Sequence, residues 1–294
     1  MTYITHSRLS KSVDTFREVW YKFSKNRLSI VGLLIVLIIT ILAAFAPYIA
    51  PYPAHAGRFV NFPEASQPPG SRHLFGTDVN GRDILSRIIY GYRFSLMMGV
   101  FVLALVVPIG VTLGLIAGYF KGTLIDTVLM RITDIFLSIP PLVLALAIAS
   151  VLTPNLTNAM LAISLSWWPW YTRLVYGLVS SLRNEFFVQA AKATGASTPH
   201  ILFREILPNC VSPVLTKMSL DMGWVILMGA SLSFVGLGVQ PPKPGLGSMI
   251  ADGTQYLPDS WWMVVFPGIA VMIVVLGFNL FGDGIRDLLS EEEA

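Results

Sequence analysis

Charged residues, cysteines and catalytic motifs are scarce in this sequence. Asp, Glu, Lys and Arg make up 13% of the 294 residues, and the single cysteine, Cys210, excludes an internal disulfide framework. The sequence has no P-loop for ATP, no H-E-x-x-H zinc motif and no G-x-S-x-G nucleophile elbow. Its four histidines lie at no metal-ligand spacing. We therefore expect no catalytic residue, metal site or cofactor site in this chain, and no nucleic-acid partner.

The sequence contains long apolar runs, and hydrophobic residues account for 54% of the chain. The runs without a charged residue are 28–54, 94–120, 135–172, 222–242 and 260–282. Because about 20 residues cross a bilayer, the third run, broken near Pro154, is long enough for two spans. The fifth span must begin near Val211 and therefore contains Lys217 and Asp221. The sequence predicts an all-α polytopic membrane protein with six transmembrane helices.

The basic residues predict how these spans are oriented. Residues 10–27 alternate aromatic and basic side chains at helical spacing, which predicts an amphipathic interfacial helix; a disordered basic leader is the alternative. The first apolar run is too long for a signal peptide and lacks a cleavage site, so we expect it to be retained. Fourteen of the 20 Lys and Arg residues fall on the side of the two termini. By the positive-inside rule, both termini are expected in the cytoplasm.

Residues 51–92 form a predicted external loop rich in proline, glycine and asparagine. The stretch from Asp78 to Asp83 superficially resembles a calcium-binding loop. Gly81 stands fourth in it, where such a loop needs glycine at the sixth place, and Ile89 stands twelfth in place of glutamate, which excludes that site. Asn80 and Gly81 predict a turn instead, and Asp83 is expected to cap the helix leading into the second span.

Small residues and prolines recur within the spans. Gly110, Gly114 and Gly118 repeat at every fourth position of the second span and predict close packing against another helix. Prolines interrupt four of the spans, at Pro108, Pro140 with Pro141, Pro169 and Pro267. Such breaks are typical both of segments near a transport pathway and of ordinary helix kinks.

The few ionisable residues near the spans favour structural pairing. Arg131 and Asp134 are three residues apart, and Lys217 and Asp221 are four apart, so each pair can meet on one face of a helix. A proton-coupled carrier needs an acidic residue or histidine near the middle of the membrane, and we expect none there. If the chain moves a solute, the energy is expected to come from another subunit.

One long polar segment, residues 183–209, carries the strongest functional signal. It presents small and aromatic residues in order, which suggests a surface that receives a partner. Gly195 ends a short helix without a Cβ clash, and Pro208 fixes the return to the membrane. The expected contact residues are Glu185, Phe186, Phe187, Gln189, Ala190, Ala191, Gly195, Ala196, Phe203, Leu207 and Pro208.

This segment resembles the cytoplasmic loop of ABC-importer permeases, through Ala190-Ala191-x-x-x-Gly195 and Leu207-Pro208 twelve residues later. Three further segments resemble the dipeptide, oligopeptide and nickel permease group: His73-Leu-Phe-Gly-Thr-Asp-x-x-Gly-Arg-Asp, Ala230-Ser-Leu-Ser-Phe-Val-Gly-Leu-Gly, and Asn279-Leu-Phe-Gly-Asp-Gly-Ile-Arg-Asp. The resemblance is to the second, shorter permease of a pair, and it reaches residue 287. Gln189 departs from the usual glutamate and lacks the charge that a salt bridge there needs, and the acidic C-terminus also departs.

The resemblance implies a type I ABC-importer permease fold and a multi-subunit complex. The implied partners are a second, related permease, two ATPase subunits that bind ATP and magnesium, and an external substrate-binding protein. The segment expected to face that protein comprises Gly76, Thr77, Asp78, Gly81, Arg82 and Asp83. The chain is expected to divide into an N-terminal part (1–92), a permease core (93–287) and an acidic tail (288–294).

The expected function is therefore ATP-driven import of di- or oligopeptides, with the cytoplasmic loop moving as a rigid lever. Oligosaccharides and nickel chelates are alternative cargoes within the same family. A secondary transporter driven by an ion gradient is the rival class, and an intramembrane enzyme is a third possibility that the missing nucleophiles and metal ligands disfavour.

Overall fold

The computed structural model describes residues 20, 21 and 23–290. Within that part of the chain the regular structure is helical, apart from one isolated bridge between Thr77 and Asp83. The long helices are α2 (Arg27–Ala44), α4 (Ile84–Tyr119), α5 (Leu124–Leu137), α6 (Pro141–Val151), α7 (Leu156–Leu182), α10 (Leu207–Phe234) and α12 (Trp262–Ser290). Of the amphipathic helix predicted at residues 10–27, residues 10–19 and 22 lie outside the described residues. The described part of the predicted acidic tail, residues 288–290, belongs to α12.

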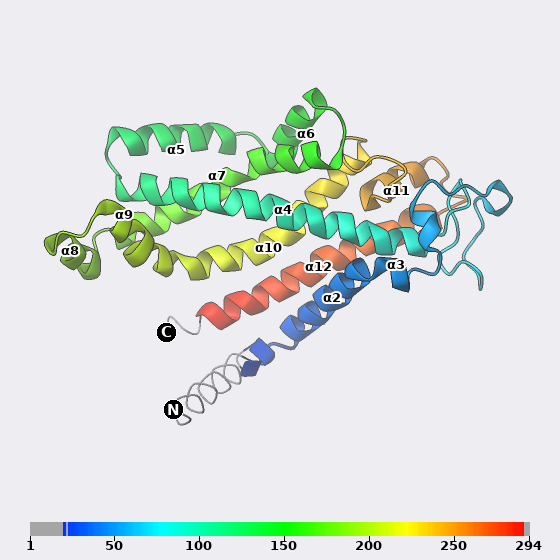
Figure 1. Cartoon of the computed structure of the whole chain (residues 1–294), viewed down its shortest axis with the longest axis horizontal. Helices are drawn as coiled ribbons and strands as arrows, with labels where there is room; N and C mark the ends of the chain where they lie inside the picture. The colour runs from blue at the N-terminus through cyan, green and yellow to red at the C-terminus, as the bar shows by residue number, and fades with distance from the viewer. Residues whose placement is uncertain (1–19, 22, 291–294) are drawn as a thin grey trace, which may run out of the picture.

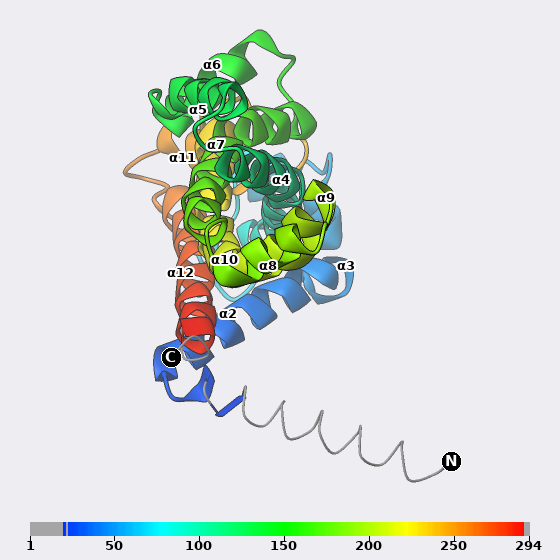
Figure 2. The same ribbon diagram turned by 90° about the vertical axis from the view of Figure 1, so that its left-hand side faces the viewer.

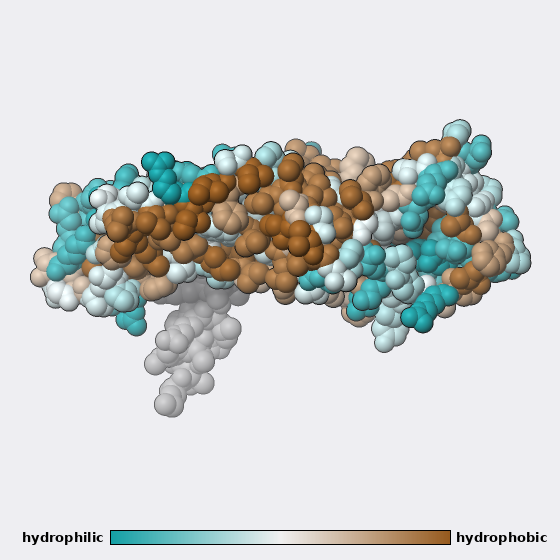
Figure 3. All heavy atoms as spheres, turned by 90° about the horizontal axis from the view of Figure 1, so that it is seen from above, coloured by the Kyte–Doolittle hydropathy of each residue, from teal (hydrophilic) through white to brown (hydrophobic). Residues whose placement is uncertain are grey.

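The long helices lie roughly along one axis, with the two loops of interest at opposite ends (Figure 1). One end carries α3 (Ala46–Ile49), η1 (Pro53–Ala56), η2 (Phe62–Glu64) and α11 (Leu246–Thr254). The other end carries α8 (Phe186–Ala193), α9 (Thr198–His200) and the π-helical segment η3 (Ile201–Ile206), and α12 finishes toward that end. Hydrophobic side chains form a broad belt between two more hydrophilic ends (Figure 3), as expected for a chain that sits in lipid.

Four of the described helical segments are long and apolar enough to cross a membrane. They are Arg27–Ala44, Ile84–Tyr119, Thr198–Phe234 and Trp262–Leu289. Helices α5 and α6 together add a fifth candidate, bent by 86° at the break before Pro141. Helix α7 has the length of a span, but it is not among these candidates. The turn predicted near Pro154 is confirmed between α6 and α7, whereas the number of six spans stays a prediction.

The glycine face of α4 packs directly against α7. A Cβ atom added to Gly110 would lie 2.5 Å from the Cβ of Tyr171, and one added to Gly114 would lie 2.7 Å from the carbonyl oxygen of Thr172. At Gly118 the nearest atom would be the Cβ of Val179, at 2.7 Å. The two backbones therefore approach along three successive turns, the contact that a small-residue repeat permits.

The charged pairs within the helices agree only partly with the sequence. Lys217 Nζ lies 3.1 Å from Asp221, which confirms that pair. The predicted pairing of Arg131 with Asp134 is wrong, because Asp134 contacts Arg173 of α7, the helix against which α5 packs.

Asp221 also contradicts the expectation that no acidic residue lies near the middle of a span. It stands halfway along α10 and its side chain is buried, where it accepts a hydrogen bond of 2.9 Å from Trp167 Nε1. The spacing to Lys217 predicted the ion pair, but only the packing of α7 on α10 supplies the indole that completes it.

Candidate functional site

The loop predicted to be external, called the external loop below, is held together by side chains of its own motif. Thr77 is fully buried; its hydroxyl donates to the carbonyl oxygen of Glu64 at 2.6 Å and accepts from the Gln67 N–H at 2.8 Å. The Thr77 carbonyl oxygen accepts from Trp262 Nε1 at 3.2 Å, which ties the loop to the first residue of α12. The side-chain hydroxyl and the backbone carbonyl of Thr77 therefore both connect segments of the same chain.

Asp78 organises the turn that follows. One carboxylate oxygen accepts from the backbone N–H groups of Asn80 and Arg82, each at 2.9 Å, and the other accepts from Arg82 Nε at 2.7 Å. Gly76 and Gly81 both have φ of +74°, the left-handed region that side chains with a Cβ rarely adopt. A carboxylate bonded to two N–H groups of the turn, next to glycines in this conformation, makes a rigid turn.

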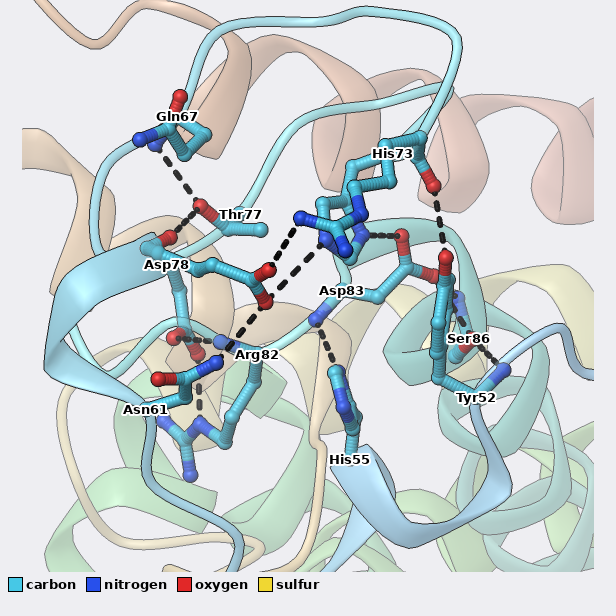
Figure 4. Close-up of polar contacts among 12 residues, drawn as sticks. Tyr52, His55, Asn61, Gln67, His73, Thr77, Asp78, Arg82, Asp83 and Ser86 are labelled. Carbon is cyan, nitrogen blue, oxygen red and sulfur yellow. Dashed lines mark hydrogen bonds and ion pairs between the residues drawn. The ribbon is translucent and has the colours of Figure 1, made fainter.

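Asp83 is the centre of a polar network in this loop (Figure 4), and it caps α4 as the sequence predicted. One carboxylate oxygen lies 2.9 Å from His73 Nδ1, and the other accepts from the Ser86 N–H at 2.8 Å and the Ser86 hydroxyl at 2.7 Å. The Asp83 N–H donates to His55 Nδ1 at 2.9 Å. Tyr52 stacks on the His55 ring and donates its backbone N–H to the Ser86 hydroxyl.

This network requires a neutral His55. Its Nδ1 accepts a hydrogen bond and so carries no proton. Burial is the main cause that lowers the pKa of His55 below its usual 6.5, partly opposed by the carboxylate of Asp83. The loop is thus built for the uncharged imidazole.

The residues expected to face a binding protein therefore lie mostly inside the loop. Thr77, Arg82 and Asp83 are buried, as are Gly76 and Gly81, while Asp78 is half-buried. Their predicted role in facing a partner stays a prediction. The exposed side chains of the same loop include Arg58, Val60, Phe62, Arg72 and Leu74.

The loop at the opposite end contains α8 and α9, which face the viewer in Figure 2. Its exposed and buried side chains are arranged in the reverse way. Phe186 is 87% exposed on α8, and Phe203 on η3 is 51% exposed. Phe187, Gln189 and Ala190 are also exposed. An exposed aromatic group at a helix end beyond the apolar belt is typical of a surface that a protein partner covers.

A buried apolar face anchors this loop to the bundle. Val188 of α8 is fully buried, as is Ile206 of η3, and Ile201 and Leu202 are nearly so. These side chains belong to the same core as α4, α7 and α10. The loop is therefore a compact extension of the membrane helices, with its aromatic residues on the outside.

The end of α8 and the contacts of Arg183 and Lys192 define the position of the loop. Gly195 has φ of +80° and follows the last residues of α8, so it ends this helix as the sequence predicted. The Arg183 guanidinium donates to the carbonyl oxygens of Tyr119 and Lys121 at 3.2 and 2.9 Å, and it thereby caps the end of α4. Lys192 lies over the ring of Tyr119, 4.9 Å from its centroid.

The remaining predicted contact residues are divided between the two faces. Glu185 is the exposed N-cap residue of α8, and Pro208 is exposed in the first turn of α10. Ala191, Ala196 and Leu207 are half-buried and pack against the core. Gln189, the departure from the family pattern, donates its amide to the carbonyl oxygen of Asn184 at 2.9 Å. Its neutral side chain is used within the loop.

Several site residues could not be identified from the sequence. The partners of Asp83, namely His55, His73 and Ser86, are 28, 10 and 3 residues away, and no local pattern connects the distant ones. Arg183 likewise reaches 62 residues back along the chain to Lys121. Val188 lies in an apolar run with Phe186 and Phe187, so the sequence alone did not single it out as the buried member of the three.

A helical bundle with an apolar belt and a compact loop at each end defines a polytopic membrane protein. Residues 110–292 match the family described as binding-protein-dependent transport system inner membrane component, and residues 15–69 match the N-terminal transmembrane domain of oligopeptide transport permease C. The chain belongs to this family of inner membrane transport components.

Relatives and a solved structure agree with that assignment. The dipeptide transport system permease protein DppC of Alkalihalophilus pseudofirmus is 44% identical, over 95% of this chain and 90% of its own. DppC of Haemophilus influenzae is 41% identical over 93% of each chain. The probable D,D-dipeptide permease DdpC of Escherichia coli is 43% identical, over 89% and 87%. A chain of the MetNI methionine ABC transporter matches with a TM-score of 0.54 at 20% identity, covering 68% of this chain and 95% of that one, which shows a type I ABC-importer permease fold.

Proposed function

We propose that this chain is one of two permease subunits of an ATP-driven importer of di- or oligopeptides. The observation that carries the proposal is the cytoplasmic loop, with Phe186 and Phe203 exposed on one side and Val188 buried on the other. A surface of this kind can receive force from a partner and pass it to the helices to which it is anchored. The names of the relatives, which are dipeptide permeases, support peptide as cargo.

The partners follow from the same arrangement. Two ATPase subunits would bind ATP and magnesium, since the chain has no P-loop of its own, and one of them would cover the α8 surface. A related permease would complete the pathway, and a binding protein would deliver cargo at the opposite end. In this proposal α8 and both termini lie in the cytoplasm, and the excess of basic residues on that side supports this orientation.

The mechanism is alternating access driven by the ATPase pair. Closure of the ATPase dimer on ATP displaces α8, and Arg183 and the buried Val188 face transmit that displacement to α4 and α7. ATP shifts the equilibrium between inward- and outward-facing states only by its difference in affinity for the two.

Substitutions at Gly195 test this coupling. Gly195→Val places a β-branched residue at φ of +80° and is expected to abolish uptake of a radiolabelled dipeptide in the reconstituted complex, with normal membrane insertion. Gly195→Asn is the matched control, because asparagine tolerates this conformation, and it is expected to retain uptake. Normal ligand-stimulated ATPase activity in Gly195→Val would contradict the proposed coupling.

A gradient-driven carrier is the second candidate, and Asp221 is the observation that favours it. A buried carboxylate in the middle of a span is the kind of group that carries a proton. Here both of its oxygens are in contact with partners within the bundle, Lys217 Nζ and Trp167 Nε1. Uptake by the chain alone that a protonophore abolishes, with no ATPase present, would establish the carrier.

A further inference from the structure

Three helices bring charged residues to a similar depth in the bundle. Asp134 of α5 contacts Arg173 of α7, and Lys217 of α10 contacts Asp221. At about 1.5 Å of rise per residue, Asp134, Arg173 and Lys217 each lie roughly 14–15 Å from the end of their helix nearest α8. Helix α7 packs against both α5 and α10, so these groups form one layer across neighbouring helices.

Aromatic rings complete the layer. The Lys217 ammonium lies 5.8 Å from the ring centroid of Trp170 and 5.3 Å from that of Tyr171. Trp170 and Arg173 are three residues apart on α7 and therefore share one face. Trp170 is 42% exposed, so the indole borders an open surface as well as the ammonium.

The exposure of this layer is unusual for charged residues in membrane helices. The side chains of Arg173 and Asp134 are 48% and 41% exposed, and that of Lys217 is 25% exposed. Charged groups in spans face a bundle interior or a water-filled cavity, because exposure to lipid is costly. This face of α5, α7 and α10 therefore cannot be the lipid-facing one.

We infer that this layer, defined as Asp134, Trp170, Arg173 and Lys217, lines the aqueous pathway and binds the charged termini of a peptide in transit. The inference rests on the proposed import of peptides and adds the residues that contact the cargo. Arg173 and Lys217 are donors that fit a terminal carboxylate, and Asp134 accepts from a terminal ammonium. Each charged terminus of the peptide replaces one partner of an ion pair that already exists in the layer. The net gain in binding free energy is therefore small, and the site can release its cargo.

Thiol labelling tests whether the layer is accessible to water, and the result does not depend on the identity of the cargo. The single cysteine, Cys210, is buried and is first replaced by alanine. Trp170→Cys and Lys217→Cys are then expected to react with a membrane-impermeant methanethiosulfonate in the assembled transporter at least ten-fold faster than Ile38→Cys. Ile38 is 55% exposed on α2 and serves as the apolar control. Equal rates at all three positions would overturn the inference.

Transport measurements test whether the layer contacts peptide. Lys217→Met and Arg173→Gln are expected to lower uptake of radiolabelled Ala-Phe at least ten-fold, while ATPase activity stimulated by the loaded binding protein stays within two-fold. Lys217→Arg keeps the charge and is expected to restore most of the uptake. Unchanged uptake in both neutral variants, or loss of uptake and ATPase activity together, would overturn the inference.

These outcomes separate the inference from the proposed function. If the unaltered transporter shows neither peptide uptake nor peptide-stimulated ATPase activity, the proposed function fails. The labelling rates at Trp170 and Lys217 would still report whether this face lines an aqueous path.

Discussion

The two loops at the ends of this bundle use their polar and aromatic residues in opposite ways. In the external loop, Thr77, Arg82 and Asp83 are buried and bonded to other parts of the same loop. In the loop at residues 183–209, which we propose is cytoplasmic, Phe186 and Phe203 are exposed, and the buried positions are apolar. A sequence motif can therefore mark either a surface that meets a partner or the framework that shapes a loop.

The difference also separates two kinds of functional consequence. A change inside the external network is expected to act through folding of that loop, because a buried carboxylate with several donors is costly to disturb. A change on the α8 surface is expected to act through binding, because Phe186 contributes little to the fold of the isolated chain. Substitutions at each end can test this separation.

The largest effect is expected at Asp83. Asp83→Ala leaves His73 and Ser86 without their buried acceptor and removes the cap of α4, so it should destabilise the protein by about 3–5 kcal/mol. The measurements are thermal unfolding in detergent and limited proteolysis of the external loop. The matched control is Arg72→Gln, because Arg72 is 79% exposed in its pair with Glu64 and is expected to contribute less than about 1 kcal/mol. Equal destabilisation by the two changes would contradict the comparison.

Next in size is the effect of Phe186→Asp on association with the ATPase subunit. Loss of a central aromatic contact costs about 2 kcal/mol or more, which corresponds to roughly 30-fold weaker binding. Binding of purified ATPase to the permease in nanodiscs measures this, and thermal stability should not change. Leu124→Asp is the control, because Leu124 is 77% exposed at the same end of the bundle but lies outside the α8 surface. If both variants bind normally, α8 is not the docking surface.

The sequence was sufficient for most of the fold and for the location of both loops. Apolar runs predicted the long helices, Gly195 predicted the end of α8, and the spacing of Lys217 and Asp221 predicted their ion pair. These three features depend on residues that are close in the chain. The errors came from contacts between distant segments. Asp134 pairs with Arg173, 39 residues away, in preference to its neighbour on the same helix.

The external loop shows the same limit more strongly. The turn residues Asn80 and Gly81 and the cap at Asp83 were predictable, since a turn and a cap are local structures. The burial of these residues could not be predicted, because it depends on Tyr52, His55 and Trp262, which contact the motif from other parts of the chain.

A smaller loss of stability is expected when the buried side chain of Val188, which packs α8 against the helix bundle, is shortened. Val188→Ala removes two methyl groups from a fully buried position, at about 0.8 kcal/mol each, so α8 should lose roughly 1.5 kcal/mol of protection. Hydrogen exchange of the α8 amides measures this loss directly. Gln189→Ala, on the exposed side of the same helix, is expected to change protection by less than about 0.5 kcal/mol. If the two variants exchange alike, the face that contains Val188 does not anchor the loop.

The smallest effect, a dependence on pH, would show that the external network depends on a neutral imidazole. Because burial lowers the pKa of His55 below 6.5, the unfolded loop binds more protons than the folded loop as the pH falls through that value. This stabilisation is complete above about pH 6.5 and declines toward the lowered pKa of the folded state. His55→Asn keeps an acceptor for the Asp83 N–H but has no proton to bind, so it should remove this part of the pH dependence. Exchange of the Asp83 amide at pH 7.5 and 5.5 provides the measurement, and an identical pH response in the two proteins would show that His55 does not titrate with loop opening.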